Sequence, residues 1–266
     1  GDYPERNGYP RFSRNTRLKT VICEDKIEIL DPPSKPQKPK SNLFMKLFPS
    51  FGMLIAAGAM AFMGGTMIIF SLISCTIAII TAVVGVMEGK KEFREKTANR
   101  IEVYQKYIAS KRQEIEECRN REWTERNEIY IPAEQEIQQV ETFSPDLFDR
   151  TPQDEDFLCV RLGSGPIESA RQVNYKKQEK LEIEDDLSLL PEQTASFYKE
   201  LQNAPVICDL KNVNAVGITG EEADRFELLK LIVTDVALRH FAADVKLFFV
   251  AEKEHAGRMH LFRFLP

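Results

Sequence analysis

A long stretch without a charged side chain, Leu47 to Met87, constrains this sequence more than any other feature. Elsewhere charges are frequent, since 29% of the 266 residues are charged. As one helix the stretch would be about 60 Å long, twice the hydrocarbon thickness of a bilayer. Gly64 and Gly65 interrupt it near the middle. The pattern predicts a transmembrane hairpin of two helices, Leu43–Met63 and Thr66–Met87, joined by a very short turn.

Two alternatives to a membrane hairpin fit this stretch less well. A buried helix of a soluble protein would rarely be so long and so free of polar residues. A cleaved signal peptide is disfavoured because the stretch is too long and lies too far from the start of the chain. The hairpin therefore remains the prediction for residues 43–87.

Lysine and arginine on the flanks predict the orientation of the hairpin. The preceding residues carry an excess of lysine, and so does the segment that follows. The basic residues are Lys35, Lys38, Lys40 and Lys46 before the stretch, and Lys90, Lys91, Arg94, Lys96 and Arg100 after it. Both flanks are therefore expected in the cytoplasm of a multi-pass protein in a bacterial cell membrane, with only the Gly64–Thr66 turn outside.

Charge and cysteine content exclude several classes of function. The formal net charge of -5 argues against a large nucleic-acid surface. The five cysteines are far apart and form no Cys-x-x-Cys pair, so neither a disulfide framework nor a zinc site is predicted. The three histidines have no metal-ligand spacing either. The chain begins with Gly1 rather than Met, and we expect a piece of a longer protein.

Residues 1–42 form a cytoplasmic tail that leads into the hairpin. Thr20–Cys23 and Lys26–Leu30 could each form a short strand. The ten residues Asp31–Lys40 contain four prolines, which remove backbone donors and favour extended polyproline geometry. This part is predicted to be a linker.

Residues 88–142 are predicted to form a helical stalk. From Glu88 to Glu128 there is no proline, and good helix formers dominate. Apolar side chains recur at a spacing of three or four, which predicts a long helix that continues the second membrane helix. The residues in question are Ile101, Tyr104, Ile108, Ile115 and Cys118. A short coiled-coil contact is the alternative use of this stripe. Pro132 ends the helix or begins the next one, over Ala133–Val140.

Residues 143–266 are predicted to form an α/β domain with a parallel sheet. Short apolar segments alternate with helix-forming ones, and glycines separate them. The predicted strands are Phe157–Leu162, Arg171–Tyr175, Pro205–Asp209, Asn214–Ile218, Val245–Ala251 and Met259–Phe264. The predicted helices are Glu192–Leu201, with Pro191 near its first turn, and Glu221–Phe241. Gly163 and Gly165 are expected to serve a turn.

The stretch LFDRTPQDEDFLCVRLGSG, residues 147–165, resembles a long motif of one protein family. The family pattern is Leu-Trp-x-Arg-x-Pro-x-Asp-x-Asp-Phe-Leu, followed by Arg-Leu-Gly-x-Gly, and this chain departs from it only in having Phe148 for Trp. The family is the FtsK/SpoIIIE-type membrane ATPase of type VII secretion systems, the EssC/EccC proteins. The resemblance runs from about Arg11 to Pro266, and the EssC type is closer.

The resemblance implies the membrane and stalk portion of a motor that exports small WXG-type proteins. It also implies a homo-oligomer that contacts the bilayer and other secretion-system membrane subunits, without nucleic acid. ATP and magnesium are expected only in downstream domains, so whether this chain itself is an enzyme is left open. Residues 143–266 would then have a degenerate P-loop ATPase fold. The alternatives are a DNA translocase of the FtsK/SpoIIIE superfamily and a non-catalytic membrane scaffold.

Gly217 and Gly220 occupy the position of a phosphate loop between a predicted strand and a predicted helix. A working loop continues with Lys and Ser or Thr, whereas here Glu221, Glu222 and Asp224 follow. These acids suit a helix N-terminus and would repel a nucleotide. No intact cofactor-binding, catalytic or metal site is therefore predicted in this chain. Cys159 and Cys208 are expected to be buried core thiols, and His240 to interact with a helix dipole.

Overall fold

The computed structural model describes residues 5–6, 9–10, 17, 20–39, 47–49, 51–52, 55–56, 58–59, 67–176 and 185–265. The chain divides into two compact units, which are described separately. The first unit comprises Gly1–Glu28, Glu114–Asn174 and Ala195–Pro266. The second unit comprises Ile29–Gln113 and Tyr175–Thr194.

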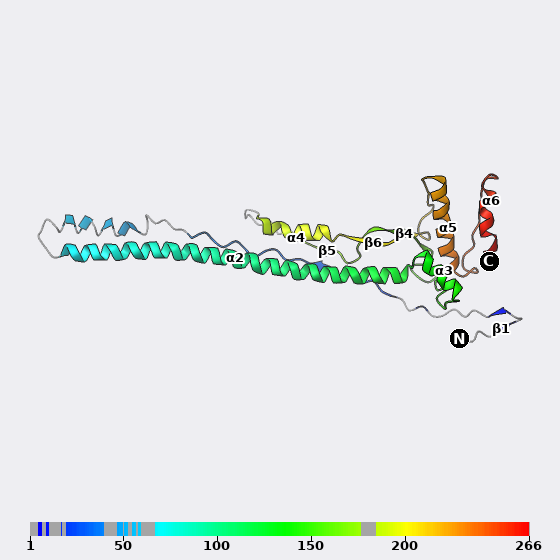
Figure 1. Ribbon diagram of the computed structural model, residues 1–266, viewed down its shortest axis with the longest axis horizontal. Helices are drawn as coiled ribbons and strands as arrows, with labels where there is room; N and C mark the ends of the chain where they lie inside the picture. The colour runs from blue at the N-terminus through cyan, green and yellow to red at the C-terminus, as the bar shows by residue number, and fades with distance from the viewer. Residues whose placement is uncertain are drawn as a thin grey trace. The chain divides into compact units, whose positions relative to one another are not determined.

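Helix α2 (Met67–Ile129) is a single uninterrupted helix, labelled in Figure 1. It joins the second predicted membrane helix to the predicted stalk, as the absence of proline led us to expect. Within it lies a stretch that is apolar and long enough to cross a membrane, and only 11% of that stretch is buried. Phe70, for example, is 78% exposed, which suits a lipid-facing side chain better than a protein core.

The first predicted membrane helix falls largely outside the described residues. Its described residues, 47–49, 51–52, 55–56 and 58–59, are helical. The predicted turn Gly64–Thr66 lies outside the described residues, so the hairpin stays a prediction.

In the second unit, the proline-rich linker lies along α2 in the opposite direction. The Tyr104 hydroxyl donates to the Leu30 carbonyl at 2.9 Å, and four residues earlier in the helix Arg100 Nε donates to the Pro33 carbonyl at 2.6 Å. Residues 31–39 are neither helix nor strand, as predicted. Tyr104 and Ile108, two members of the apolar stripe, are each 3% exposed, so the stripe packs within its own chain.

Helix α4 (Asp186–Phe197) lies beside α2 in the same unit (Figure 1). Arg112 Nη2 donates to the Thr194 hydroxyl, and Arg100 Nη1 lies 2.7 Å from the Asp185 carboxylate. The predicted bounds Glu192–Leu201 were wrong, because the helix begins six residues earlier and Pro191 lies inside it. Pro191 is the sixth residue of α4, beyond the first four positions whose N–H groups lack intrahelical partners, so the helix continues through the proline with one i to i−4 hydrogen bond fewer.

The first unit contains an antiparallel ribbon of two strands, β4 (Cys159–Glu168) and β6 (Glu200–Asp209). Val160 pairs with Cys208, and Gly165 with Ala204. The prediction of a turn at Gly163 and Gly165 was wrong, since both lie inside β4. They flank irregularities in the register, where an unpaired residue bends the strand and a glycine is readily accommodated.

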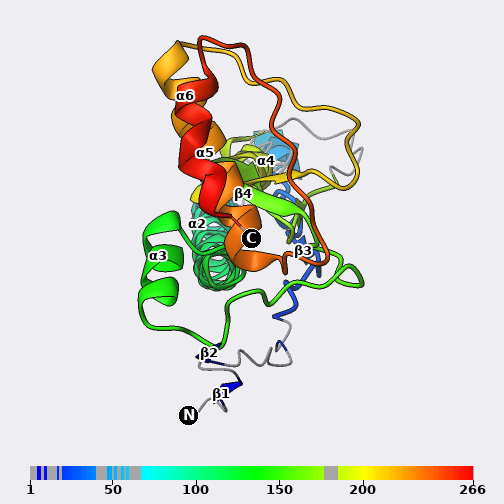
Figure 2. The ribbon, with the colours of Figure 1, turned by 90° about the vertical axis from the view of Figure 1, so that its right-hand side faces the viewer.

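Helices α3 (Ala133–Glu141) and α5 (Glu222–Arg239) complete the core of the first unit. Helix α5 packs against both β4 and α3. Val233 and Val236 of α5 are buried, and so is Val160 of β4. Helix α3 begins after Pro132, which is its N-cap, as predicted. The short helix α6 (Ala256–Met259) lies beside α5, as Figure 2 shows, and leads into the 3-10 helix η1 (His260–Phe264).

The remaining strands are two residues long. Strand β1 (Glu5–Arg6) pairs with β2 (Tyr9–Pro10), and β3 (Ile27–Glu28) pairs in parallel with β5 (Val173–Asn174). Thr20–Cys23 is not a strand.

The predicted parallel α/β sheet is absent from the described residues. The segments Asn214–Ile218 and Val245–Ala251 have no strand geometry, and Met259–Phe264 is helical. A strand needs a neighbouring strand to pair its backbone groups. No described strand pairs with Val245–Ala251, and its Val250 is 99% exposed. The strand propensity of Val245–Ala251 was therefore not sufficient to form a strand without a pairing partner.

Candidate functional site

The predicted phosphate-loop position is open and exposed. Gly217 and Gly220 lie in coil before α5, and an added Cβ at either would meet no atom within 4 Å. Gly220 has a φ of 135°, which favours glycine in the turn that precedes the helix. In the first turn of α5, the Glu222 carboxylate lies 2.8 Å from Arg258 Nη1. The acid at this helix terminus thus has a cation of the same chain as its partner.

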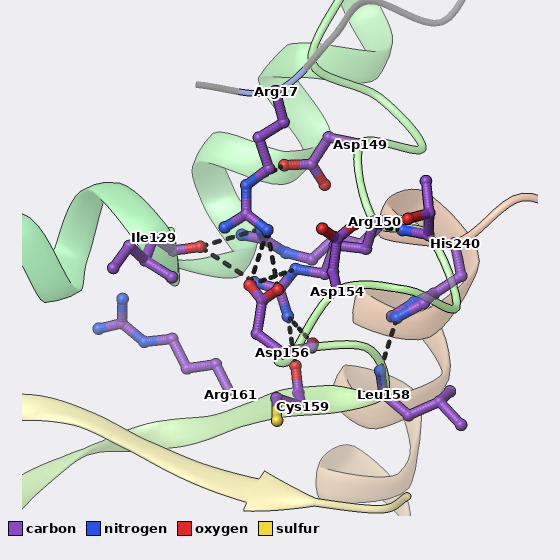
Figure 3. A network of polar contacts seen from close by, with 12 residues as sticks. Arg17, Ile129, Asp149, Arg150, Asp154, Asp156, Leu158, Cys159, Arg161 and His240 are labelled. Carbon is purple, nitrogen blue, oxygen red and sulfur yellow. Dashed lines mark hydrogen bonds and ion pairs between the residues drawn. The ribbon is translucent and has the colours of Figure 1, made fainter. Parts of the chain in front are cut away.

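The described polar groups converge elsewhere, around Arg150 of the 147–165 motif (Figure 3). Arg150 is fully buried. Its Nη1 donates to the Cys159 carbonyl at 2.6 Å and to the Asp156 carbonyl at 3.2 Å. Burial lowers the pKa of Arg150, and the Asp156 carboxylate, 3.4 Å from Nε, acts in the opposite direction. The buried guanidinium therefore joins the loop to the start of β4.

The same side chain holds the C-terminus of helix α2. Arg150 Nη2 donates to the carbonyl of Ile129, the last residue of α2, at 3.0 Å, and Arg239 Nη1 of α5 donates to the same oxygen at 3.1 Å. Arg161 Nη1 of β4 donates to the next carbonyl, that of Tyr130, at 2.5 Å. Carbonyls at a helix C-terminus lack intrahelical partners and attract positive charge. Three arginines from three different segments satisfy them here, and we call this group the arginine cluster.

Two aspartates of the motif shape the loop that carries Arg150. The Asp154 carboxylate accepts bonds from both the backbone N–H and the hydroxyl of Thr151, each at 2.8 Å. The Asp156 carboxylate lies 2.7 Å from Arg17 Nη1, so the N-terminal tail also contacts the loop. The Asp-x-Asp spacing thus combines a turn cap with a counter-ion.

His240 joins the motif to the end of α5. The Leu158 N–H donates to His240 Nε2 at 2.9 Å, and His240 Nδ1 lies 3.0 Å from the Val236 carbonyl. Nε2 must therefore be unprotonated, and Nδ1 carries the hydrogen that it donates. Burial lowers the pKa of His240, which favours this neutral form. His240 was expected to interact with a helix dipole, and it lies at the C-cap of α5, where its buried neutral ring contacts a helix carbonyl.

A second buried group connects α3 to α5. Glu136 is 2% exposed, and its carboxylate lies 2.8 Å from Arg239 Nε. Arg239 Nε is also 2.7 Å from the Asp235 carboxylate, whose other oxygen accepts the Arg161 backbone N–H at 2.8 Å. Burial and the neighbouring Asp235 raise the pKa of Glu136 to about 7. Two carboxylates therefore face one guanidinium, and near neutral pH the buried Glu136 carboxyl takes up a proton readily.

The sequence identified Arg150, Asp154, Asp156 and Arg161 as residues of the motif. It did not predict which groups they contact. It missed Glu136, Asp235 and Arg239 altogether. The available signal was the spacing of Asp235 and Arg239, four apart within an otherwise apolar stretch of α5. Cys159 is buried, as predicted, and burial raises the pKa of its thiol, whereas Cys208 is only half-buried.

Comparison with known proteins relates the chain to secretion-system proteins. Over 268 residues it is 24% identical to the type VII secretion system protein EssC of Staphylococcus aureus strain MSSA476, covering 99% of this chain and 18% of the relative. It is 23% identical to the ESX secretion system protein EccC of Geobacillus thermodenitrificans, and this match covers 97% of this chain and 18% of the relative. It is 22% identical to the ESX secretion system protein YukB of Bacillus subtilis strain 168, and this match covers 97% of this chain and 17% of the relative.

These matches span nearly all of the chain but less than a fifth of each relative. No protein-family profile matches the sequence. The resemblance inferred from the 147–165 motif is confirmed.

Proposed function

We infer that this homologue of the EssC and EccC proteins is the membrane-anchoring and coupling portion of a type VII secretion motor. The exported substrates would be small WXG-type proteins, and other secretion-system membrane subunits would be its partners. The whole protein would be an ATPase that works as a homo-oligomer in a bacterial cell membrane.

The observation that carries this proposal is the arginine cluster at the end of α2. Arg150, Arg161 and Arg239 come from the motif loop, β4 and α5, and all donate to carbonyls at the C-terminus of one helix. A helix end held in this way cannot move independently of those three segments. We propose that the cluster passes displacement between the first unit and helix α2.

The membrane hairpin is part of the same proposal. Its support is the exposed apolar surface of α2, the helical residues between 47 and 59, and the lysine-rich flanks on both sides. The two spans would be Leu43–Met63 and Thr66–Met87, and both termini would be cytoplasmic. The long apolar stretch of α2 is compatible with spanning by length and composition.

We propose that residues 143–266 act as a coupling element and do not bind nucleotide. This proposal does not require the domain to have a P-loop ATPase fold. Phosphoryl transfer depends on positioning and charge neutralisation. Glu221 and Glu222 follow Gly220 where a lysine and a hydroxyl would be required. ATP and magnesium would bind to other domains of the whole protein, which is several times longer in the relatives.

The proposal is tested by export from cells that carry the full-length protein with Arg150→Lys. Lysine keeps the charge but cannot donate to three carbonyls from one planar group. We expect WXG-type proteins in the culture medium to fall at least tenfold, at unchanged amounts of membrane-inserted protein. Arg121→Lys is the matched control, because Arg121 is exposed on α2, the helix whose last carbonyl accepts from Arg150.

The alternatives give different outcomes. If deletion of the gene leaves export intact but impairs chromosome segregation, the chain is part of a DNA translocase. If deletion abolishes export while Arg150→Lys exports normally, the chain serves as a membrane scaffold and the coupling role is wrong.

A further inference from the structure

Two cysteines from distant parts of the sequence meet across one guanidinium group in the first unit. Arg171 Nη1 donates to the Cys118 sulfur at 2.7 Å, and Arg171 Nη2 donates to the Cys23 sulfur at 3.1 Å. The two nitrogens are bonded to the same carbon, so both sulfurs contact one and the same guanidinium group. Cys118 is on helix α2, and Cys23 belongs to the extended segment that precedes β3.

The surroundings of the two sulfurs differ in charge. Arg171 is the charged group in hydrogen-bond contact with Cys118, whose neighbours along the helix are Glu117 and Arg119. The hydrogen bond with Cys118 is the main reason that the pKa of Arg171 is raised. The Cys23 thiol instead also lies 3.2 Å from the Asp25 carboxylate, to which its S–H can donate.

The two cysteines also differ in solvent exposure. Cys118 is partly exposed and Cys23 is exposed. Reactive cysteines in proteins lie in electropositive, partly exposed sites, often with a second cysteine within reach. Cys159, by contrast, is buried, and burial raises the pKa of its thiol. Cys208 is half-buried on β6 and serves as an internal comparison.

We propose that Cys118 and Cys23 are a redox modification site, which hydroperoxides oxidise to an intramolecular disulfide. The Cys118 thiolate attacks the peroxide: a sulfur–oxygen bond forms, the oxygen–oxygen bond breaks, and the leaving oxygen takes up a proton as water or an alcohol. Cys23 then loses its proton, with Asp25 as the nearest acceptor, and attacks the Cys118 sulfenic sulfur. The disulfide forms and hydroxide leaves as water, so the sulfurs lose the two electrons that the peroxide gains.

The disulfide would replace hydrogen bonds through Arg171 by a covalent link between the tail and helix α2. The Arg171 side chain, which also donates from Nε to the Asp25 carbonyl at 3.1 Å, would have to leave its position between the sulfurs. Oxidation would thus attach residues 20–26 to the part of α2 that belongs to the same unit. This proposal does not depend on the secretion function.

The test uses the full chain, purified in detergent with reduced thiols and treated with dilute hydrogen peroxide. Free thiols are blocked by alkylation, and the digested protein is analysed by mass spectrometry. We expect the peptide pair linked through Cys23 and Cys118, formed at least ten times faster than any oxidation of Cys208. With Cys23→Ser, we expect a sulfenic acid at Cys118, which dimedone traps.

The role of Arg171 is tested with Arg171→Gln, and Arg121→Gln is the matched control on exposed α2 surface. The first variant should slow oxidation of Cys118 at least fivefold, and the control should not change it. Three results would overturn the proposal: both thiols still free after peroxide treatment, disulfides only between separate molecules, or equal oxidation rates in Arg171→Gln and the control. Because the readout is thiol chemistry, export need not be measured.

Discussion

The guanidinium of Arg150 donates a hydrogen bond to the carbonyl oxygen of Ile129, 3.0 Å away, and Ile129 is the last residue of helix α2. One buried side chain of the 147–165 motif thereby ends the longest helix in the described residues. The motif is thus explained as a structural junction: Arg150 and Arg161 donate to the end of α2, while Asp149 and Asp156 pair with Arg17 and Asp154 caps its own loop.

Replacing Arg150 by methionine should destabilise the first unit by about 3–5 kcal/mol, because it removes the Arg150 donor from the buried Cys159 carbonyl and leaves Arg17 as the remaining arginine beside the Asp156 carboxylate. Urea unfolding can be followed by the fluorescence of Trp123, the single tryptophan, whose indole N–H donates to the Asn203 carbonyl of β6. The exposed Arg121→Met should change stability by less than about 0.5 kcal/mol. Similar stabilities for the two variants would contradict this account.

Acid should weaken the first unit through His240. The pKa of His240 is lowered in the folded state, so below about pH 6.5 the unfolded chain binds a proton that the folded chain does not. Stability from this residue is therefore present above pH 6.5 and is lost as the pH falls. We expect His240→Ala to cost about 1–3 kcal/mol at pH 8, because the Leu158 N–H loses its acceptor.

The cost of His240→Ala should shrink as the pH is lowered from 8 to 5.5, since the wild type loses stability there. The measurement is urea unfolding at each pH, with Trp123 fluorescence as the signal. A cost that is the same at every pH would show that His240 does not titrate between the two states.

Glu136 should give the opposite pH dependence of stability to that of His240. Its pKa is raised to about 7 in the folded protein, by burial and by Asp235, from a model-compound value of 4.5. The folded state therefore binds the extra proton, and the stability from this residue, present below pH 4.5, is lost as the pH rises towards 7 and above. Glu136→Gln mimics the protonated side chain and should stabilise the unit at pH 8 by an amount of the order of 1–3 kcal/mol.

At pH 5 the same substitution should have little effect, because the wild-type carboxyl is protonated there. Glu134→Gln is a suitable control, since Glu134 lies in the first turn of the same helix. If Glu136→Gln is destabilising at both pH values, the ion pair with Arg239 outweighs the cost of burying the Glu136 charge, and the predicted sign is wrong.

Breaking helix α2 should abolish export if displacement passes along it. Prolines at Gln105 and Ser110, which are exposed positions on either side of the buried Ile108, would each cost about 3 kcal/mol of helix stability. We expect lost secretion of WXG-type proteins with normal membrane insertion, measured by fractionation and immunoblot. Alanines at the same positions should export normally. Full export by the double-proline protein would show that a continuous α2 is unnecessary.

The hairpin topology can be tested by labelling. In a background without the five native cysteines, a cysteine at Gly65 should react with a membrane-impermeant maleimide in intact cells. Cysteines at Lys38 and Lys91 should react only after the membrane is permeabilised, because both flanks are predicted to be cytoplasmic. The reverse pattern would place the termini outside the cell and refute the proposed orientation.

The sequence by itself determined helices α2, α3 and α5 and the motif. The uninterrupted α2, the start of α3 after Pro132 and the extent of α5 follow from local features, namely proline positions and the spacing of apolar residues over a few turns. The family resemblance also depended on a contiguous string of residues. These properties need no knowledge of which distant segments touch.

Only the tertiary structure decided how the segments pair. Val245–Ala251 has strand propensity but no strand partner among the described residues, whereas Cys159–Glu168 pairs with β6 in an antiparallel register that no local pattern specifies. Glu136 and Arg239, or Cys23 and Cys118, are about a hundred residues apart, and their proximity arises from packing. A charge is stabilised in a buried site by partners that the fold brings to it, so its role cannot be inferred from its neighbours in sequence.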